Sequence, residues 1–434
     1  MKNLLSLLMI SSMLFVTLSC GKKDDDQPQP GVEKTYVITN DRKGSTDVKR
    51  IIGTINENFT IKKEDKYLLS GGVFVAEGAT LTIEAGATIY GDADGSGPAF
   101  LSVLRGAKIY AVGTATEPIV FTSSNVLVPG ISPESGDWAG LVLNGRASIN
   151  VGSSAEGEGG TGTYGGTDDD DNSGELKYVR LEYAGRIVGT DNELNGFSFN
   201  GVGRGTRLSY LQSYMGEDDG FEFFGGTANL SYAVSTGSKD DSFDWTHGWR
   251  GNGQFWVVVQ APGRGDRGIE ADNLEQNFMA APISNPTLSN LTFIGSDGNS
   301  GATIGMKLRH GTQAKIYNAL ITGFKSAGID LDDSSSTAYQ GTSLIVDNTI
   351  VDTTALGSSS NAFKDASVLK NYVSNVAGTI GTLTNTYVGT VASGAKNPTE
   401  LGAYFEAANY IGAVPSDNDW TKGWVKNLDG SIHQ

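Results

Sequence analysis

Residues 219–227 read DGFEFFGGT, and the segment Gly220-Phe221-Glu222-Phe223 within this stretch recurs along the chain. Each copy has Gly or Ser at its first position, followed by an apolar, a polar and an apolar residue. The copies begin at Gly196, Gly220, Ser242, Gly268, Gly305 and Gly328. Successive copies therefore lie 24, 22, 26, 37 and 23 residues apart. A repeat that returns at such intervals is typical of a solenoid, in which each coil stacks on the one before it.

A second repeated element follows most copies of the first. Its copies begin at Leu176, Leu208, Leu230, Phe255, Leu288, Ile316 and Ile345. Residues 72–75, 79–83 and 87–90 extend the same pattern toward the N-terminus. Alternate side chains of a strand point to opposite faces, so we expect the apolar residues in a central core and the polar ones in solvent. The 59 glycines agree with many short strands joined by tight turns.

The repeats predict an all-β protein, a single-stranded parallel β-helix (β-solenoid), over residues 45–425. The longer intervals predict loops inserted into the coils at residues 150–175 and 262–287, and residues 426–434 are expected to form a C-terminal tail. The alternative is a β-propeller, but its blades of about 40 residues are longer than most intervals seen here.

The N-terminal segment has the features of a lipoprotein signal peptide. Lys2 precedes an apolar stretch at residues 4–18, which is short for a membrane span, and Ser19 precedes Cys20, the only cysteine. We predict a signal peptide at residues 1–19, lipidation of Cys20 and an acidic tether at residues 20–44. The alternatives are an unmodified thiol beside an ordinary cleavage site and a plain solvated linker.

The net charge of -17 at pH 7 restricts the classes of partner. It opposes binding to nucleic acid and to anionic lipid surfaces. A cation, a neutral sugar polymer or a basic protein remains compatible with it.

Several stretches resemble right-handed parallel β-helix lipoproteins of Bacteroidota, which have a pectin-lyase-like fold. They are residues 67–75 with 78–86, residues 219–227 and residues 418–424. Residues 18–20 also resemble the lipoprotein signal of such proteins, although Thr17 replaces the usual leucine, and residues 22–26 resemble their acidic export signal. The resemblance covers about residues 45–425. It implies a right-handed helix exposed on the outer membrane beside a nutrient-uptake system, such as a TonB-dependent transporter.

The polar positions of the first repeat should form a row along the helix. These positions are Ser198, Glu222, Asp244, Glu270, Lys307 and Asp330, and Asp218-Asp219 and Asp240-Asp241 precede two of the strands. Equivalent residues on neighbouring coils stack about 4.8 Å apart, so the carboxylates should crowd one patch. Crowded carboxylates raise one another's pKa or bind a hard cation. We therefore predict Ca²⁺ ligands at Asp218, Asp219, Asp240 and Asp241; the alternative is that these Asp side chains cap turns.

The leading functional hypothesis is polysaccharide binding on this face. The candidate ligand-binding residues are Glu222, Asp244, Trp249, Arg250, Glu270 and Asp330. Carboxylates accept hydrogen bonds from sugar hydroxyls, and an exposed indole packs on a sugar ring. Trp245 is expected to point inward, whereas Trp249 lies in a turn and is expected to be exposed. A scaffold lipoprotein of an outer-membrane complex is a nonenzymatic alternative.

An enzymatic alternative uses the same face. Asp218-Asp219, His247-Gly248 and residues 307–311 resemble elements of polygalacturonase-type glycoside hydrolases, which share the fold. If the protein is an enzyme, the candidate catalytic residues are Asp218, Asp219, Asp240, Asp241, His247 and Arg309. Inverting hydrolysis needs two carboxyl groups about 6.5 to 9.5 Å apart. A Ca²⁺-dependent lyase would instead use a basic side chain, for which Arg250 and Lys307 are available.

The glycine-rich loop at residues 150–175 contains four consecutive aspartates, residues 168–171. Its composition predicts a mobile, solvated excursion from the helix. A second Ca²⁺ site is the alternative.

Overall fold

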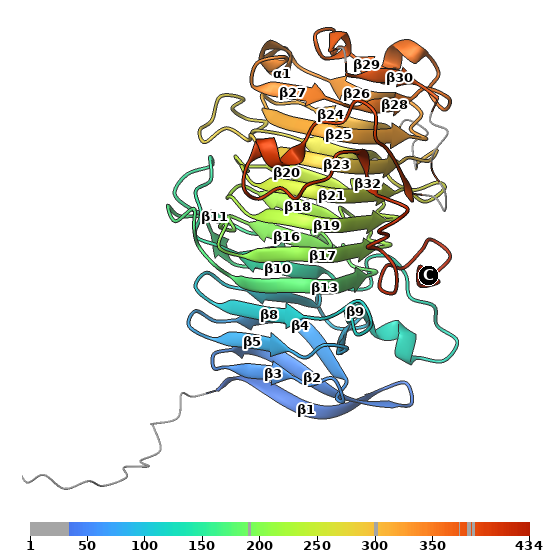
Figure 1. Ribbon diagram of the computed structural model, residues 1–434. Coiled ribbons are helices and arrows are strands. Elements are labelled where there is room, and N and C mark those ends of the chain that lie inside the picture. The colour runs from blue at the N-terminus through green and yellow to red at the C-terminus, as the bar shows by residue number, and fades with distance from the viewer. Residues whose placement is uncertain (1–33, 190–191, 299–302, 373, 380–382, 384–386) are drawn as a thin grey trace, which may run out of the picture. The chain divides into compact units, whose positions relative to one another are not determined.

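The computed structural model describes residues 34–434 except 190–191, 299–302, 373, 380–382 and 384–386. The predicted signal peptide, the lipidation site Cys20 and the first part of the predicted tether lie outside the described residues. From Lys34 onward the chain forms a right-handed parallel β-helix, which confirms the predicted fold class (Figure 1). Within the described residues, 26 strands belong to one hydrogen-bonded sheet.

The coils build three faces, each a parallel ladder of strands. The first face begins with β3 (Phe59–Ile61), β5 (Thr80–Ile83) and β8 (Lys108–Val112), and the second includes β6 (Thr88–Gly91) and β9 (Ile119–Ser123). The third face contains β7 (Phe100–Val103), β10 (Gly140–Asn144), β16 (Phe197–Asn200), β18 (Phe221–Phe224), β20 (Phe243–Thr246), β22 (Arg267–Ala271), β24 (Ile304–Leu308), β26 (Ala327–Leu331) and β29 (Phe363–Lys364). The first repeat of the sequence corresponds to this third face.

Longer strands cover two faces because they bend at their centre. At the N-terminal end, β2 (Thr46–Ile55) and β4 (Tyr67–Val75) cover the second and third faces. Farther along, the first and second faces are shared by β13 (Gly174–Glu182), β17 (Arg207–Tyr214), β19 (Asn229–Thr236), β21 (Asn252–Val259), β23 (Thr287–Ile294) and β25 (Ala314–Thr322). The last coils use β27 (Leu344–Asp347), β28 (Ile350–Asp352) and β30 (Val376–Gly378).

The bend in each long strand is made by one residue with positive φ. They are Gly53 in β2, Gly71 in β4 and, in the strands shared by the first and second faces, Tyr178, Tyr210, Tyr232, Phe255, Asn290 and Asn318. Asn348 also has positive φ and lies at the corner between β27 and β28. Left-handed backbone is unfavourable for side chains other than glycine and must be stabilised by its surroundings. Here the aromatic members stack, with ring centroids 4.3 Å apart for Tyr178–Tyr210 and for Tyr210–Tyr232.

The core is a column of stacked apolar side chains. The rings of Phe197, Phe221 and Phe243 lie 5.0 Å apart from one coil to the next. Trp245 is buried, as expected. Trp249 is also fully buried, so the prediction that it is exposed is wrong. Its ring stacks on Phe223 at 4.1 Å, and Nε1 donates to the Ala228 carbonyl oxygen at 3.1 Å.

The predicted mobile loop at residues 150–175 is ordered and packs on the third face, contrary to expectation. It contains the hairpin of β11 (Ala155–Glu156) and β12 (Thr163–Tyr164), and Tyr164 is buried. Asp169 accepts hydrogen bonds from the backbone N–H and the hydroxyl of Ser148 and pairs with Arg250 at 3.0 Å. Asp169, one of the four aspartates, therefore holds the loop on the coils through Ser148 and Arg250, and these contacts are called the clamp below. A second short hairpin, β14 (Ile187–Gly189) and β15 (Asn192–Glu193), follows nearby in the chain.

Folded structure begins earlier than the predicted boundary at residue 45. β1 (Thr35–Lys43) lies within the predicted tether and pairs antiparallel with β2. At the end of β1, Lys43 is buried and pairs with Asp92 at 3.1 Å.

The C-terminal residues 387–434, called the strap below, run back along the stack after the last coil (Figure 1). The strap contains β31 (Gly389–Val391) and β32 (Ile411–Val414). It follows the row of bend residues: Asn348 bonds to Gly394, Asn318 to Lys396 and Asn290 to Tyr410. Residues 426–434, predicted as a tail, belong to the strap.

Helices are few in the described residues: α1 (Ser334–Tyr339) and five short 3₁₀ turns. The turns are Ser124–Leu127, Glu158–Gly160, Ser359–Ala362, Leu369–Asn371 and Pro398–Leu401. None of these described helices has the length and apolar character required to cross a bilayer.

Candidate functional site

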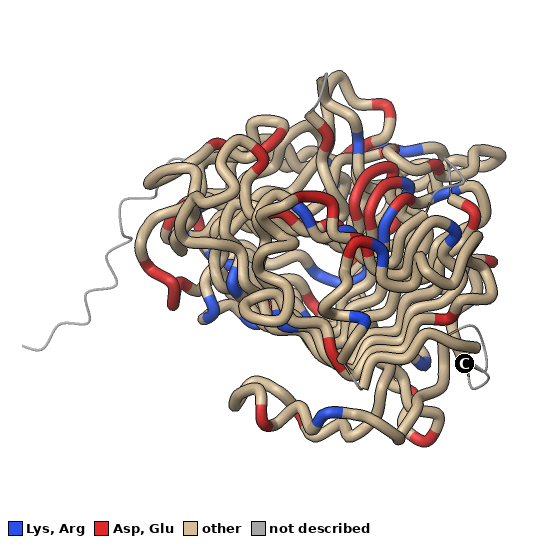
Figure 2. The backbone as a smooth tube through the Cα atoms, turned by 90° about the horizontal axis from the view of Figure 1, so that it is seen from above, with Lys and Arg blue, Asp and Glu red and all other residues tan. Residues whose placement is uncertain are grey.

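The polar positions of the third face form the expected row. Glu222 lies opposite Ser198 and Asp244, and Glu270 lies opposite Asp244 and Lys307. Asp330 follows Lys307, and Lys364 continues the row. Viewed along the stack, acidic segments of successive coils lie above one another at one edge (Figure 2).

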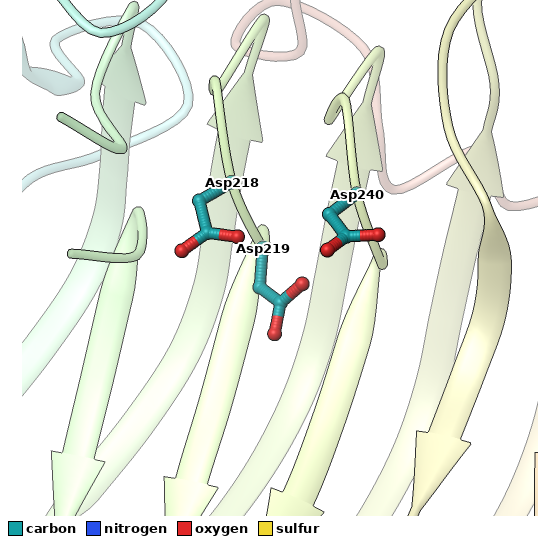
Figure 3. Close-up of side chains that lie close together, drawn as sticks. All are labelled: Asp218, Asp219 and Asp240. Atoms are coloured by element: carbon teal, nitrogen blue, oxygen red, sulfur yellow. The ribbon is translucent and has the colours of Figure 1, made fainter. Parts of the chain in front are cut away.

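Eight carboxyl groups from three coils come together there and are called the acidic ladder. They are Asp218, Asp219, Glu222, Asp240, Asp241, Asp244, Asp266 and Glu270. They form four overlapping groups of three, and in each group one oxygen per residue lies within 4.8 Å of the others. Figure 3 shows Asp218 and Asp240 at matching points of neighbouring coils, with Asp219 beside them. The four predicted Ca²⁺ ligands thus meet, joined by four further carboxyl groups.

Burial makes the charged state unfavourable for several carboxyl groups of the ladder. Burial, together with the Asp240 and Glu193 carboxylates, raises the pKa of Asp218 to about 7. Burial and then neighbouring carboxylates raise the pKa values of Asp219, Glu222, Asp241 and Asp244 well above their usual range. Asp218 is therefore protonated in part of the molecules near neutral pH, and a bound cation would stabilise the ionised form of these carboxyl groups.

Two ladder residues accept backbone hydrogen bonds from the next coil. Asp219 Oδ1 accepts a hydrogen bond from the Asp241 N–H at 2.9 Å, and Asp241 Oδ1 accepts one from the Arg267 N–H at 2.6 Å. These contacts agree with the turn-capping alternative. Asp244 differs, because its Oδ1 is buried without a hydrogen-bond partner. Glu270 Oε1 is also buried without a hydrogen-bond partner, but it forms an ion pair with Arg267 Nε at 3.1 Å. Buried carboxylate oxygens without a donor are costly, so Asp244, which forms no ion pair among the described residues, is the ladder member that most requires a ligand.

The basic residues predicted to serve as binding or catalytic groups are held by carboxylates. Arg250 pairs with Asp169, and Lys307 pairs with Asp330 at 3.0 Å. Arg309 pairs with Glu270 and, at 2.8 Å, with Asp272. Asp330 is itself fully buried. Asp330 and Lys307 are therefore neutralised within the protein, and Arg309 lies against the end of the ladder.

The candidate catalytic residue His247 and a second histidine, His310, lie just after third-face strands. His247 Nδ1 and the Tyr164 hydroxyl share a hydrogen bond of 2.8 Å. Burial lowers the pKa of His247 to about 4, so its ring is neutral at neutral pH. His310 Nδ1 lies 2.9 Å from Asp272 Oδ2. Among the described contacts, each of these two histidines has a specific hydrogen-bond partner.

The sequence patterns missed several residues near the ladder. Burial and then the carboxylates of Asp218 and Glu193 raise the pKa of Glu158, in the 150–175 loop, to about 8. Asn195 donates a hydrogen bond to Glu222. Glu158 lies in an inserted loop that follows no repeat, so no register pointed to it. Asn195 could have been found, because it precedes Gly196 as Asp219 precedes Gly220. Asp266 could have been found, because it precedes β22 as Asp240 precedes β20 and its N–H donates to the Asp240 carbonyl oxygen at 3.0 Å.

Comparison with protein families agrees with this architecture. Residues 53–425 match the family model described as a pectate-lyase-like β-helix domain. No curated protein and no solved structure matches the chain.

Proposed function

The chain belongs to the family of pectate-lyase-like β-helix domains, and from this premise we propose that it binds an extracellular polysaccharide through the acidic ladder. The proposal includes lipidation of Cys20 and display on the outer membrane of a Bacteroidota cell. A nutrient-uptake system, such as a TonB-dependent transporter, would take up the captured sugar. The lipoprotein-like N-terminal sequence supports this location.

One observation carries the binding proposal. Eight carboxyl groups from three coils meet on one face, and the buried Asp244 Oδ1 among them has no hydrogen-bond partner. Carboxylate oxygens are hard ligands, and those within each group of three are close enough together to coordinate Ca²⁺. Asp218, Asp219, Asp240 and Asp241 would hold the ion, and a Ca²⁺ ion would also offer open positions to sugar hydroxyls. Glu222, Asp244 and Glu270 would accept hydrogen bonds from the same sugar.

The other predicted contact residues have different roles in this proposal. Trp249 is a core residue. Arg250 holds the 150–175 loop through Asp169, and Asp330 fixes Lys307 and Lys364. The ligand surface is therefore smaller than the sequence suggested and is centred on the ladder.

A glycan array read with and without a chelator tests the proposal. We expect binding to one class of polysaccharide that falls at least tenfold when the chelator is added or when Asp219 and Asp241 are changed to Asn. The Asp→Asn change keeps the acceptor for the backbone N–H and removes the charge. Asp47→Asn is the matched control, because Asp47 is 88% exposed and lies on β2. Absence of binding to every glycan would overturn the proposal and favour a scaffold lipoprotein.

A polysaccharide hydrolase or Ca²⁺-dependent lyase is the second candidate. The observation in its favour is the pKa of Asp218, raised to about 7 by burial and neighbouring carboxylates, because a carboxyl group protonated near neutral pH can act as a general acid. The pairing of Arg250 and Lys307 with carboxylates is against the lyase. Release of reducing ends or unsaturated products that stops in Asp218→Asn would establish catalysis.

A further inference from the structure

The N-terminal end of the β-helix differs in charge from the rest of the molecule. Residues 34–66, which include β1, β2, β3 and the turn before β4, contain eight Lys and Arg against five Asp and Glu, a net charge of +3. Residues 67–434 contain 21 Lys and Arg against 40 Asp and Glu, a net charge of -19. The first coil is therefore basic although the chain as a whole is acidic. This coil lies at one end of the stack (Figure 1).

Most of the basic side chains of this coil are available to an external anion. Two of the eight, Lys43 and Arg50, pair with the buried Asp92 and are used by the fold. The other six lie at the surface and are Lys34, Arg42, Lys49, Lys62, Lys63 and Lys66. Among the described residues, Lys62 and Lys66 form no ion pair, and the remaining four pair with carboxylates that are at least partly exposed. Such surface pairs are weak, so they give way readily to another anion.

Exposed apolar side chains lie on the same coil. Val37 and Ile52 are opposite each other in the β1–β2 ladder and are 57% and 46% exposed. Ile38 lies opposite the fully buried Ile51 but is itself 38% exposed, because β1 is the first strand of the stack. The outer edge of β1 pairs with no other strand in the described part of the chain. An apolar edge strand of this kind promotes aggregation unless something covers it.

We propose that this end of the β-helix rests on the anionic surface of a lipid bilayer. Lys and Arg side chains near such a surface bind lipid phosphates, and aliphatic side chains enter the boundary between headgroups and acyl chains. The position of the predicted anchor favours this partner. Cys20 precedes Lys34 by 14 residues, so even a fully extended segment keeps Lys34 within about 50 Å of the lipidated residue. The inference rests on the proposed membrane location and adds the orientation of the β-helix on the membrane.

The acidic remainder of the molecule does not oppose this contact. Salt screens charges over about 8 Å at physiological ionic strength. Six strand steps, through β2, β4, β7, β10 and β16, separate β1 from β18, where the acidic ladder begins. At about 4.8 Å per step, the ladder lies about 29 Å from β1, which is more than three screening lengths. The charge of the first coil, rather than the net charge of the chain, therefore decides the interaction, and the ladder stays clear of the lipid.

Vesicle sedimentation with a protein of residues 21–434 tests this inference. This protein contains the whole described β-helix and lacks both Cys20 and the apolar residues 4–18, which would bind a bilayer by themselves. We expect it to bind vesicles of phosphatidylcholine mixed with phosphatidylglycerol at least about tenfold more tightly than vesicles of phosphatidylcholine alone. This binding should be lost at about 1 M salt, where the screening length falls to about 3 Å.

Variants of the first coil test which residues carry the contact. Lys62→Ala with Lys66→Ala should weaken vesicle binding about 25-fold, because each basic residue near an anionic surface strengthens binding about fivefold. Lys315→Ala with Lys325→Ala is the matched control. Both of these side chains are exposed, form no ion pair among the described residues and lie on late coils, in β25 and just before β26. Ile52→Thr keeps a β-branched side chain in β2 and should weaken binding by a smaller factor.

Equal binding to vesicles with and without phosphatidylglycerol would overturn the inference, as would unchanged binding in Lys62→Ala with Lys66→Ala. Sedimentation of the unmodified protein as a dimer that dissociates in Val37→Lys would also overturn it, because a second copy would then cover β1. The lysine variant should bind glycans as the unmodified protein does. Absence of vesicle binding with intact glycan binding would contradict only this inference, whereas vesicle binding without any glycan binding would contradict only the proposed function.

Discussion

Gln212 and Lys426 are 214 residues apart in sequence and are joined by two hydrogen bonds of 2.8 Å. Gln212 Nε2 donates to the Lys426 carbonyl oxygen, and the Lys426 N–H donates to Gln212 Oε1. Gln254 makes the same pair of contacts with the backbone of Glu406. The strap pairs with no coil strand at these points. The side-chain amides of Gln212 and Gln254 instead bond its backbone N–H and carbonyl groups and hold it on the coils.

Replacing Gln212 with Leu should destabilise the protein. The substitution leaves both backbone groups of Lys426 without partners, at a cost of about 1–3 kcal/mol each. We expect a lower melting temperature and a smaller free energy of unfolding in urea. Gln276→Leu is the control, because Gln276 lies exposed in a loop. An unchanged melting temperature in Gln212→Leu would show that the strap adds little to stability.

Replacing Trp249 with Ala should affect stability rather than ligand contact. Trp249 is fully buried, and truncation of a buried Trp costs about 3–5 kcal/mol. Trp249→Phe retains an aromatic ring stacked on Phe223 and should lose less stability than Trp249→Ala. Folded Trp249→Phe should bind glycans with the affinity of the unmodified protein. A loss of affinity in a fully folded Trp249→Phe sample would contradict the core assignment.

The acidic ladder should make the metal-free protein less stable as pH rises. Burial and neighbouring carboxylates raise the native pKa of Asp218 from 3.8 to about 7 and that of Glu158 from 4.5 to about 8. Unfolding therefore releases protons from these groups, so their contribution to stability is present below pH 4 and is lost as pH rises to 8.

Urea unfolding in chelator at several pH values measures this trend. The double variant Asp218→Asn with Glu158→Gln should show a flatter dependence between pH 5 and 8. His247, whose pKa burial lowers to about 4, acts in the opposite direction below pH 6.5, and the comparison between variants cancels its effect. Identical slopes for the variant and the unmodified protein would contradict the raised pKa values.

Added Ca²⁺ should stabilise the protein at neutral pH. A ligand at 100 times its Kd that binds only the native state adds about 2.7 kcal/mol. We expect the melting temperature to rise when Ca²⁺ is added and to return to its metal-free value after chelation. In Asp219→Asn with Asp241→Asn the rise should shrink, and in Asp47→Asn it should not. A melting temperature independent of Ca²⁺ and chelator would exclude a tight native-state site.

The 150–175 loop should open when its clamp is removed. Asp169→Asn keeps the hydrogen bonds from Ser148 but loses the charge that pairs with Arg250, a partly exposed contact worth about 1 kcal/mol or less. We expect faster proteolytic cleavage within the loop. Asp168→Asn is the control, because the structure gives Asp168 no ion pair among the described residues. Equal cleavage rates would show that Arg250 does not hold the loop.

Local spacing was sufficient to predict the parallel β-helix and the register of its third face. The repeat that begins at Gly220 returns once per coil, and parallel stacking places equivalent residues opposite each other. The same register predicted that Asp218 and Asp240 lie side by side, since both precede their strands by the same number of residues. Apolar alternation likewise predicted that Trp245 points inward.

Only the tertiary structure decided which of these polar residues are available to a ligand. The pairing of Arg250 with Asp169 and the position of Glu158 depend on where the 150–175 loop folds back, and this loop carries no repeat. Trp249 is buried because its ring enters the core and stacks on Phe223. The position of the strap could be predicted even less from local patterns, because the strap contacts coils more than 200 residues earlier in the chain. The sequence by itself thus determined the coil and its register, since these arise from neighbouring repeats. Burial and ion pairing depend on long-range packing that no local pattern encodes.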